Sequence, residues 1–413
     1  MHINRGSGLA ALTPAAALMA LAACGGGGGE DGSDPIPPFD MQTGVVATDL
    51  DGDGRVDVAV ASTHVAGPPP HPGSVRIYLH EPSSPRGFRQ AASYDVGADP
   101  WDLGAADLTA DDITDLVVAT PNGDQVWLLK QDPARRGSFV AARSFATPRA
   151  PYQATAADLD GDRRADLAVA LNSTVTGGIA LLFQDPSVPG DFGNAVHVPV
   201  GAGGTMAATG DVDGDQRIDL LLPSPSSDPA RAGLYLSLQD ADVPGTFHPA
   251  VRLEAGQKPA HVAVADLDAD GRLDLVVAND GIDARGSGIT VLLAHPTSPG
   301  QFRPGTFYAM NDIVQMSCIA DLDGDGRPDL AVAASVPGLV NDYESVVQLF
   351  LQDPARPGHF VRGGRHDSGD LAEFIAVADL DGDGHVDVVT GEGPQVLYND
   401  AVRPGTLQAA RPL

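Results

Sequence analysis

The chain of 413 residues is poor in cysteine and in basic residues. It has two cysteines, Cys24 and Cys318, and its 25 Lys and Arg against 55 Asp and Glu give a net charge of −30 at pH 7. A protein that binds nucleic acid presents a basic face to the phosphates, so this charge balance argues against that class. An exported protein with so few cysteines also needs something other than disulfides to stabilise it.

Catalytic signatures are also missing. The sequence has no HExxH, GxSxG or CxxC motif and no phosphate-cradling glycine loop. Its 11 histidines are scattered without the spacing of metal ligands, and such histidines have surface or loop roles by default. No sequence motif therefore indicates an enzyme.

Turn-forming residues, in contrast, are abundant. The chain has 49 Gly and 34 Pro, and 43% of its residues are hydrophobic. This composition favours many short strands joined by turns, which is typical of an all-β protein. The length fits two or three ordinary domains or one large β fold.

The N-terminal segment predicts export. Residues 1–23 contain one early arginine and an apolar run too short to span a membrane comfortably, which is typical of a signal peptide. LAAC, ending at Cys24, resembles the bacterial lipobox, and the resemblance implies a lipidated Cys24. Residues 24–40 then form a flexible Gly-rich tether. We therefore expect a lipid anchor to the bacterial cell envelope, at the outer membrane or cell surface, as the chain's only membrane contact. Since Cys24 is then not available, Cys318 is left without a disulfide partner and is expected to fill a small buried space.

Four aspartates stand within nine residues in DLDGDGRVD, which begins at Asp49. Clustered carboxylates repel one another unless a cation lies among them. An all-oxygen loop suits a hard cation, and a flexible one favours Ca²⁺ over Mg²⁺. Gly54 at position 6 allows the sharp turn, and Arg55 at position 7 offers only its backbone carbonyl, so its guanidinium is expected to lie outward. The first nine positions resemble an EF-hand loop, but no Glu follows at position 12.

The motif recurs seven times at intervals of 51 to 58 residues, and each copy is expected to bind one Ca²⁺ through positions 1, 3, 5, 7 and 9. The expected ligands are Asp49, Asp51, Asp53, Arg55 and Asp57; Asp107, Thr109, Asp111, Ile113 and Asp115; Asp158, Asp160, Asp162, Arg164 and Asp166; Asp211, Asp213, Asp215, Arg217 and Asp219; Asp266, Asp268, Asp270, Arg272 and Asp274; Asp321, Asp323, Asp325, Arg327 and Asp329; and Asp379, Asp381, Asp383, His385 and Asp387.

The seven loops differ in quality. In the second, Thr109 replaces a carboxylate and Asp112 replaces the turn glycine, so this site is expected to be weak. Arg163 and Gln216 hold the turn position in the third and fourth loops at some conformational cost. Loops one, five, six and seven are expected to bind best. Without ions, the carboxylates of every loop should repel one another, so calcium is expected to support folding.

Each repeat contains four short strands. In the third copy these are DLAVAL (166–171), GGIALLF (177–183), NAVHVPV and TMAATG, with period-two alternation and Pro/Gly punctuation. Seven such units predict a seven-bladed β-propeller of four-stranded blades with Ca-binding hairpin loops.

The DxDGDGxxD loops, the DLAVA-type strands and connectors such as LFLQDPARPGHF (from Leu349) resemble the FG-GAP/VCBS repeat family, which includes the propeller of integrin α-subunits. The resemblance covers residues 41–413 and implies an integrin-like propeller, although such repeats occur in proteins of many functions. Two closures are open: seven complete blades over residues 44–411, or a C-terminal GTLQAARPL strand that joins the first blade.

In an antiparallel blade the aspartate loops and the connectors share one face of the disc. The loops of the opposite face, called here the variable face, differ between copies; examples begin at His64, Pro121, Pro223, Asn279 and Ser335. Variation on a rigid scaffold indicates either recognition or solvated turns. The candidate ligand residues on this face, at the mouth of the channel, are Trp101, Asp102, Tyr152, Gln153, His261, Gln315 and Glu373, of which the aromatic side chains are alternatively ordinary packing residues.

The leading hypothesis is a monomeric, calcium-stabilised, lipid-anchored envelope module that binds an unknown protein or glycan without catalysis. One alternative is a polysaccharide lyase or hydrolase with an acid/base pair around Glu373, Asp102 or His261. Another is an envelope assembly or scaffold protein. All three are compatible with the same scaffold.

Overall fold

The structure is a computed structural model that describes residues 39–413 apart from 66–69, 141, 174–176, 202, 227, 229, 282–285, 337–343, 371, 372 and 392. The predicted signal peptide, Cys24 and nearly all of the predicted tether lie outside the described residues. The anchor therefore stays a prediction.

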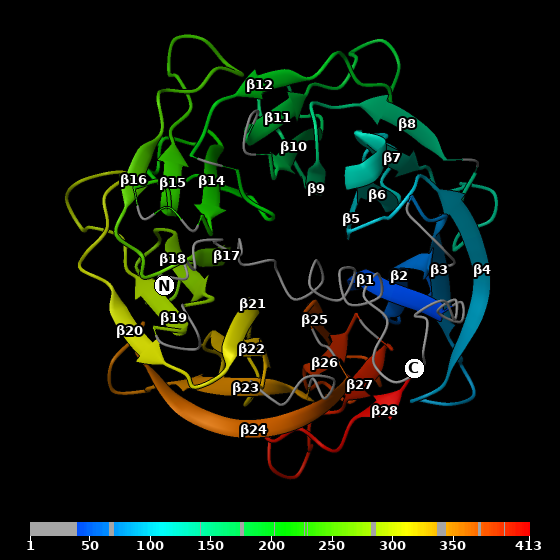
Figure 1. The fold of residues 1–413 in the computed structure, drawn as a ribbon. Coiled ribbons are helices and arrows are strands. Elements are labelled where there is room, and N and C mark those ends of the chain that lie inside the picture. The colour runs from blue at the N-terminus through cyan, green and yellow to red at the C-terminus, as the bar shows by residue number, and fades with distance from the viewer. Residues whose placement is uncertain are drawn as a thin grey trace, which may run out of the picture.

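The described chain forms seven four-stranded antiparallel sheets, arranged as blades around a central axis (Figure 1). This confirms the all-β, seven-bladed propeller. The first four blades contain β1 (Phe39–Thr48), β2 (Asp57–Val65), β3 (Gly73–His80) and β4 (Phe88–Val96); β5 (Asp102–Ala106), β6 (Asp115–Thr120), β7 (Gln125–Leu129) and β8 (Arg143–Ala146); β9 (Pro151–Ala157), β10 (Asp166–Leu171), β11 (Gly178–Leu182) and β12 (Val196–Val198); and β13 (Ala208–Gly210), β14 (Asp219–Ser224), β15 (Gly233–Ser237) and β16 (Val251–Leu253).

The last three blades contain β17 (Pro259–Ala265), β18 (Asp274–Asn279), β19 (Gly288–Leu292) and β20 (Thr306–Ala309); β21 (Ile313–Ala320), β22 (Asp329–Ser335), β23 (Glu344–Gln352) and β24 (Phe360–Asp370); and β25 (Ile375–Ala378), β26 (Asp387–Thr390), β27 (Gln395–Leu397) and β28 (Arg411–Pro412). The helical element of the described chain is the 3₁₀ turn η1 (Pro121–Gly123). Within the described residues, no helix has the length and apolar character needed to cross a membrane.

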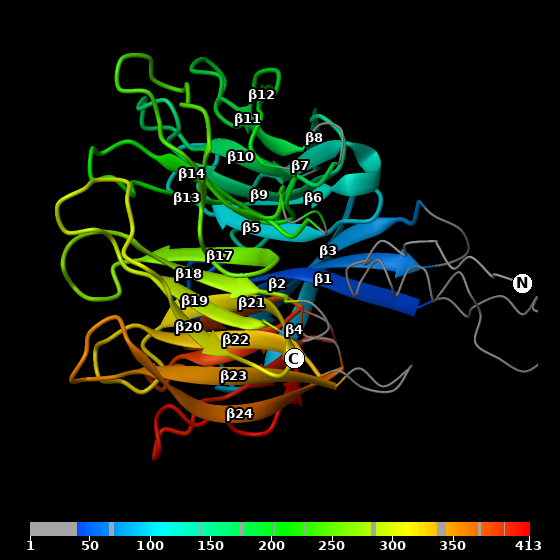
Figure 2. The same cartoon turned by 60° about the vertical axis from the view of Figure 1, so that its left-hand side comes forward.

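The first strand of each blade is innermost. Neighbouring first strands β1, β5, β9, β13, β17, β21 and β25 contact one another around the axis, and the fourth strands form the rim (Figure 1). Each aspartate loop joins a first strand to a second, and each connector joins a third to a fourth. Both therefore lie on one face, and Figure 2 shows the two faces of the disc from the side.

The ring closes without a shared blade. The C-terminal strand β28 pairs with β27 of its own blade, with Val396 opposite Arg411 and Gln395 opposite Pro412. Of the two closures left open by the sequence, the structure has the seven complete blades. The first and last blades are therefore held together by side chains.

Seven hydrophobic clusters form the core, one at each junction between neighbouring blades. The second strands are buried on both faces; all six residues of β10, for example, are buried. At the junction that closes the ring, Val45 and Val58 of blade 1 pack with Leu380 and Val389 of blade 7. Burial of apolar surface between blades thus stabilises every junction, including the last.

Six of the seven connectors carry a glycine with positive φ where the connector packs against the aspartate loop of the preceding blade. These glycines are Gly137, Gly190, Gly245, Gly300, Gly358 and Gly405. A Cβ at Gly137, for example, would lie 2.9 Å from the Cβ of Asp51, so a larger residue would not fit there.

Arg86 takes the corresponding place in the first connector. Its Nε donates to Asp381 Oδ2 at 2.7 Å, its Nη1 donates to Gln408 Oε1 at 3.1 Å, and its guanidinium lies 4.3 Å from the ring centre of Tyr398. All three partners belong to blade 7. One arginine therefore fastens blade 7 to blade 1.

Substitution Arg86→Ala should weaken the closing junction. We expect a loss of about 1–2 kcal/mol, because an ion pair with the well-buried Asp381 and a cation–π contact disappear together. The measurement is the midpoint of denaturant unfolding. Arg403→Ala, which removes a solvent-exposed pair with Asp400 in blade 7, is the control and should leave the midpoint unchanged; equal effects of the two variants would contradict the role of Arg86.

Candidate functional site

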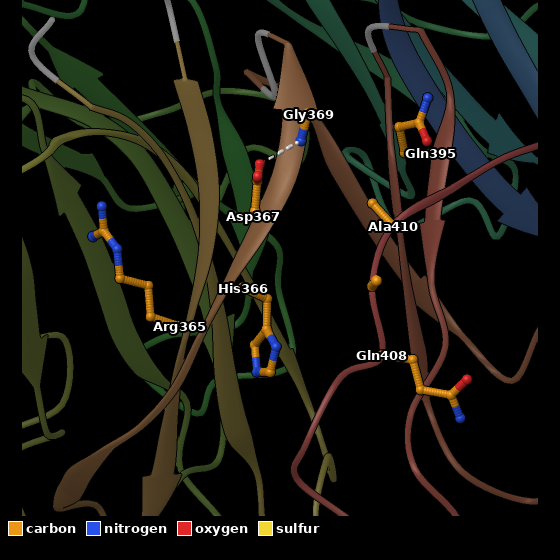
Figure 3. A pocket seen from close by; sticks show the side chains of 8 residues that line it. Arg365, His366, Asp367, Gly369, Gln395, Gln408 and Ala410 are labelled. Carbon is orange, nitrogen blue, oxygen red and sulfur yellow. Dashed lines mark hydrogen bonds between the residues drawn. The ribbon is translucent and has the colours of Figure 1, made fainter.

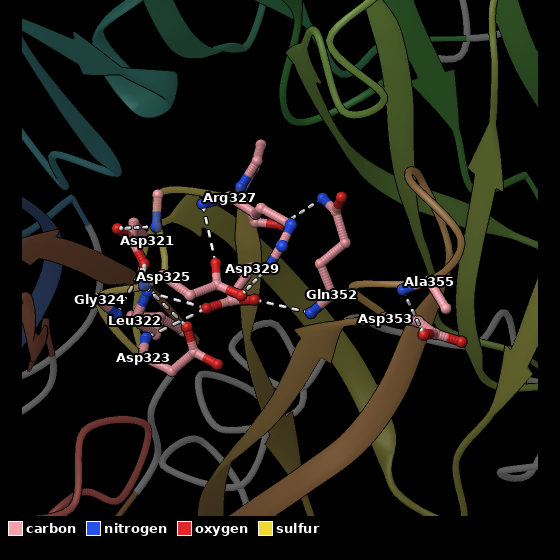
Figure 4. Close-up of polar contacts among 12 residues, drawn as sticks. Asp321, Leu322, Asp323, Gly324, Asp325, Arg327, Asp329, Gln352, Asp353 and Ala355 are labelled. Carbon is pink, nitrogen blue, oxygen red and sulfur yellow. Dashed lines mark hydrogen bonds and ion pairs between the residues drawn. The ribbon is translucent and has the colours of Figure 1, made fainter.

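The carboxylates of the aspartate loops accept hydrogen bonds from backbone N–H groups of the same loop. In blade 6, Asp321 Oδ1 accepts the N–H groups of Gly324 at 2.8 Å and Asp325 at 3.1 Å, and its Oδ2 accepts the N–H of Gly326 at 2.8 Å (Figure 4). Asp323 Oδ1 accepts the N–H of Asp325, and Asp325 Oδ1 accepts the N–H of Arg327. Positions 3 and 5 therefore each use one carboxylate oxygen to shape the loop and keep the other for a further partner.

Carboxylates converge in the loops of blades 1, 3, 4, 5 and 6. In each of these loops, three acidic side chains place one oxygen apiece within 4.8 Å of one another: Asp49, Asp51 and Asp53; Asp158, Asp160 and Asp166; Asp211, Asp213 and Asp215; Asp266, Asp268 and Asp274; and Asp321, Asp323 and Asp325. Such a set of hard oxygen donors fits a divalent cation of the calcium type.

The charged form of the carboxylates at position 3 is disfavoured by burial and by a neighbouring charge. Burial, followed by repulsion from the position-5 carboxylate, raises the pKa of Asp51, Asp160, Asp213, Asp268 and Asp323. Asp268 Oδ1 is buried and has no hydrogen-bond partner within the described chain. A cation among these oxygens would remove both costs, so the donor set of these loops fits the predicted ion.

The carboxylate at position 9 is buried in all seven blades and joins two loops. One oxygen accepts the N–H of the residue at position 2, and the other accepts the N–H of a residue at the end of the third strand or two positions after it, at 2.7–3.1 Å. In blade 6, for example, Asp329 binds Leu322 and Gln352 (Figure 4).

Burial raises the pKa of these carboxyls, to about 6 for Asp57, Asp115, Asp166, Asp274 and Asp329 and to about 7 for Asp219 and Asp387. The sequence predicted these residues as metal ligands alone. The structure gives them a second role as a clasp between loop and connector, because both oxygens already hold backbone donors.

The arginines at position 7 do not point outward, so that expectation was wrong. Their guanidinium groups fold back onto the position-5 carboxylate of the same loop; Arg55, for example, donates to Asp53 Oδ2 at 2.6 Å. Arg164, Arg217, Arg272 and Arg327 make the same contact in their loops. The reason is electrostatic: the oxygen at position 5 that the backbone does not use is the nearest anion.

The residue at position 6 has a left-handed backbone in every loop, as the sequence predicted. Gly54, Gly271, Gly326 and Gly384 have φ of 82–87°, and Asp112, Arg163 and Gln216 have φ of 60–70°. The non-glycine residues hold this conformation because their N–H is bound by the position-1 carboxylate, as Gln216 N–H is by Asp211 Oδ2 at 2.8 Å.

The second loop keeps this shape with one carboxylate fewer. Asp107 Oδ2 accepts the N–H of Asp112 at 2.9 Å, and Asp111 Oδ1 accepts the N–H of Ile113 at 3.2 Å. Thr109 is 3% exposed and lies against Gly190 of the next connector. The loop is therefore held by backbone contacts and packing, while its donor set for an ion is the poorest of the seven.

Three of the candidate ligand residues meet at the channel mouth on the variable face. Trp101, Gln315 and Glu373 line one small cavity of about 50 Å³ together with Met206 and Phe374. The four residues Trp101, Gln315, Glu373 and Met206 come from four different blades. This convergence required the ring and agrees with the predicted position of these side chains.

Trp101 is mostly buried against other aromatic side chains. Its side chain is 8% exposed, and its ring packs edge-to-face with Tyr152 at 5.0 Å and with Phe374 at 6.3 Å between ring centres. These contacts favour the alternative that Trp101 and Tyr152 are packing residues.

The remaining candidates lie on the inner strands without lining that cavity. Burial raises the pKa of half-buried Asp102 to about 7, although hydrogen bonds from Leu103 and Gln153 lower it. Gln153 Oε1 accepts the N–H of Ala207 at 2.6 Å. Burial lowers the pKa of His261 to about 4, and its Nδ1 lies 3.5 Å from the hydroxyl of Ser317.

A larger hollow of about 570 Å³ opens at the rim between β24 and the last blade (Figure 3). Its polar groups are already engaged: Arg365 pairs with Asp312, His366 Nε2 accepts the N–H of Leu407 at 3.4 Å, and Gln408 accepts from Arg86. Burial lowers the pKa of His366. The sequence did not predict this hollow, which is lined by β24, of eleven residues, and by the segment that leads into β28, of two.

Known proteins resemble this chain in its repeats and its fold. The family model described as FG-GAP-like repeat matches residues 49–118, 107–169, 211–277 and 321–390, together more than half of the chain, and each match begins at the first aspartate of a loop. No curated protein matches the chain in sequence.

Solved structures match at low identity. BBS1N, crystallised in complex with ARL6DN, is 13% identical with a TM-score of 0.53, over 89% of this chain and 98% of that one. Rhamnogalacturonan lyase YesW is 13% identical with a TM-score of 0.48, over 86% and 70%. The V. cholerae biofilm matrix protein Bap1 is 12% identical with a TM-score of 0.45, over 91% and 80%. At these identities the likeness concerns the fold alone.

The left-handed turn makes a prediction at position 6. Gln216→Gly should raise the free energy of unfolding by about 1 kcal/mol, because glycine adopts positive φ without a Cβ clash. Gly326→Ala should lower it by about the same amount, although its Cβ would meet no atom within 4 Å. Denaturant unfolding in chelator measures both without a contribution from ions; effects of the same sign would contradict the argument.

Asp102 makes a prediction about pH. Its folded pKa of about 7 lies above the unfolded value of 3.8, so the folded state holds the extra proton and stability is lost as pH rises from 4 to 7. Asp102→Asn removes this dependence. The variant should gain about 2–3 kcal/mol relative to the parent between pH 5 and pH 8, measured by denaturant unfolding; a constant difference across that range would show that Asp102 does not titrate there.

Proposed function

The chain belongs to the FG-GAP-like repeat family, and from that premise we propose that it is a calcium-stabilised propeller that binds a protein or glycan partner without catalysis. We place it on the bacterial cell envelope, anchored through lipid on Cys24. The observation that carries the proposal is the convergence of three carboxylate oxygens within 4.8 Å in each of five aspartate loops.

Calcium is the ion that fits these loops best. Carboxylates at positions 1, 3 and 5 and the carbonyl at position 7 offer oxygen donors, and the flexible hairpin suits a large cation with many ligands. When bound, the ion would supply positive charge that offsets the mutual repulsion of the loop carboxylates. Because the ion binds the folded loops and not the unfolded chain, its binding stabilises the ring by mass action.

We propose that the partner binds on the variable face. The loop face repeats nearly the same sequence seven times, whereas the opposite loops differ in length and composition. Gln315 and Glu373 line the cavity at the centre of that face, and Gln315 Nε2 is buried without a hydrogen-bond partner among the described residues. An amide and a carboxylate beside Trp101 suit the hydroxyl or amide groups of a sugar or peptide.

A lyase or hydrolase is the second candidate. Asp102 favours it, because a carboxyl pKa of about 7 suits general acid/base catalysis at neutral pH. The geometry favours binding instead: Glu373 lines the cavity, but neither Asp102 nor His261 does. The predicted acid/base pair therefore does not share one cavity in the described chain. An envelope scaffold protein would use the same variable face for a protein partner.

The test of function is a screen of the purified chain against glycan arrays and envelope proteins in calcium. Gln315→Ala combined with Glu373→Gln should weaken the detected binding at least about fivefold, which is the effect of losing one or two hydrogen bonds. Arg403→Ala on the loop face is the matched control and should bind as the parent does. Turnover of an acidic polysaccharide, or the absence of any glycan or protein ligand, would contradict the proposal.

Calcium removal tests the metal. We expect the melting temperature to fall on the order of 10 °C in EGTA, because several sites each contribute binding free energy to the folded state alone. Readdition of Ca²⁺ should restore the value, and Mg²⁺ at the same concentration should restore less of it. A melting temperature that is the same with and without chelator would overturn the metal proposal.

A further inference from the structure

Every aspartate loop is paired with one basic side chain. The pairs join a cationic group to the carboxylate at position 3 or 5: Arg55 with Asp53, Lys130 with Asp111, Arg164 with Asp162, Arg217 with Asp215, Arg272 with Asp270, Arg327 with Asp325, and Arg86 with Asp381. Seven loops thus have seven cations.

These cations come from three different places in the repeat. Five are the arginine at position 7 of the loop itself. The second and seventh loops have Ile113 and His385 at that position, and there the cation comes from a connector: Lys130, 3.6 Å from Asp111, from the same blade, and Arg86, 2.7 Å from Asp381, from the next blade. If the pairing only reflected the repeated sequence, it would be missing in the two loops that lack an arginine at position 7. In those loops, however, Lys130 or Arg86 supplies the cation.

The cations take the carboxylate oxygen that the loop does not use. Asp53 Oδ1 accepts the N–H of Arg55, while Asp53 Oδ2 accepts the guanidinium. Asp111 and Asp381 follow the same rule, with Oδ1 on a backbone N–H and Oδ2 beside the cation. The basic group therefore occupies the oxygen that remains available to a bound ion.

The position-7 arginines are weakly held at the position-5 carboxylates. Their side chains are 27–42% exposed, and Nε of Arg164, Arg217 and Arg272 has no hydrogen-bond partner among the described residues. Each guanidinium is thus held mainly by the one carboxylate. A half-exposed ion pair of this kind is weak enough to exchange with a divalent cation.

We propose that these seven side chains are tethered counterions, which neutralise part of each loop when it holds no metal, and that the five position-7 arginines release the carboxylate when an ion binds. This inference rests on the proposed calcium sites and extends them. It also changes the expectation that ion-free loops suffer unrelieved repulsion, because each loop keeps one cation of its own. Arginine suits the role since it stays charged at every physiological pH.

The test uses Arg327→Gln in blade 6, followed by hydrogen exchange of the peptide that covers residues 321–329 during a calcium titration. In chelator, the variant loop should exchange faster than the parent loop. In calcium, its midpoint should shift about two- to fivefold toward lower concentration, because a competing cation is gone. Arg356→Gln removes a connector pair with Asp353 in the same blade and should change neither value.

A rescue series in blade 2 keeps the test independent of one variant. Lys130→Leu should speed exchange of residues 107–115 in chelator, and Ile113→Arg added to it should restore the parent rate, because the cation then comes from position 7 as in five other loops. Rescue failure would overturn the proposal, as would an unchanged or higher calcium midpoint in Arg327→Gln. If hydrogen exchange of the parent does not respond to calcium in any loop, the proposed function fails and counterion exchange fails with it. If the parent loop responds to calcium and Arg327→Gln exchanges and titrates as the parent does, only counterion exchange is overturned.

Discussion

One buried carboxylate in each blade joins the two loops on which the rest of the propeller depends. The aspartate at position 9 accepts a backbone N–H from its own loop with one oxygen and a backbone N–H from the connector with the other, seven times around the ring. A charged group buried among backbone donors fixes geometry strongly, because leaving either donor unpaired is costly. The remaining carboxylates are thereby held in place beside it.

The junctions extend this arrangement from blade to blade. The connector amide of Gln184 donates to Leu108 O in the loop of the preceding blade, and Gln239, Gln352 and Asn399 make equivalent bonds. Glycines let connectors approach those loops at six junctions, and Arg86 replaces the glycine at the seventh. The closing junction therefore uses charge where the others use close packing. A ring without shared strands or disulfides is held by these contacts and by the seven interblade cores.

The sequence predicted the features that recur within one repeat. The count of blades, the four strands and the left-handed position 6 follow from spacing, alternation and turn residues, and all three are confirmed. Pairs between residues of different loops were not predictable: Arg86 meets Asp381 of another blade across 295 positions of sequence, and Lys130 reaches Asp111 from a different loop of the same blade. A comparison of the seven connectors would have shown Arg86 in a glycine position, but only the ring shows its partner. The outward position of Arg55 was predicted wrongly because the backbone role of Asp53 Oδ1, which leaves Oδ2 for the guanidinium, is visible only in the folded loop.

The most direct measurement of this account is the unfolding midpoint of Asp329→Asn, recorded both in excess calcium and in chelator. The amide keeps the size of the side chain but turns an NH₂ group toward either Leu322 or Gln352, so one backbone donor loses its acceptor. The account predicts a loss of about 2–3 kcal/mol in both conditions, since the clasp does not need the ion. A loss in calcium alone would mean that Asp329 acts only as a metal ligand, and no loss in either condition would contradict the clasp itself.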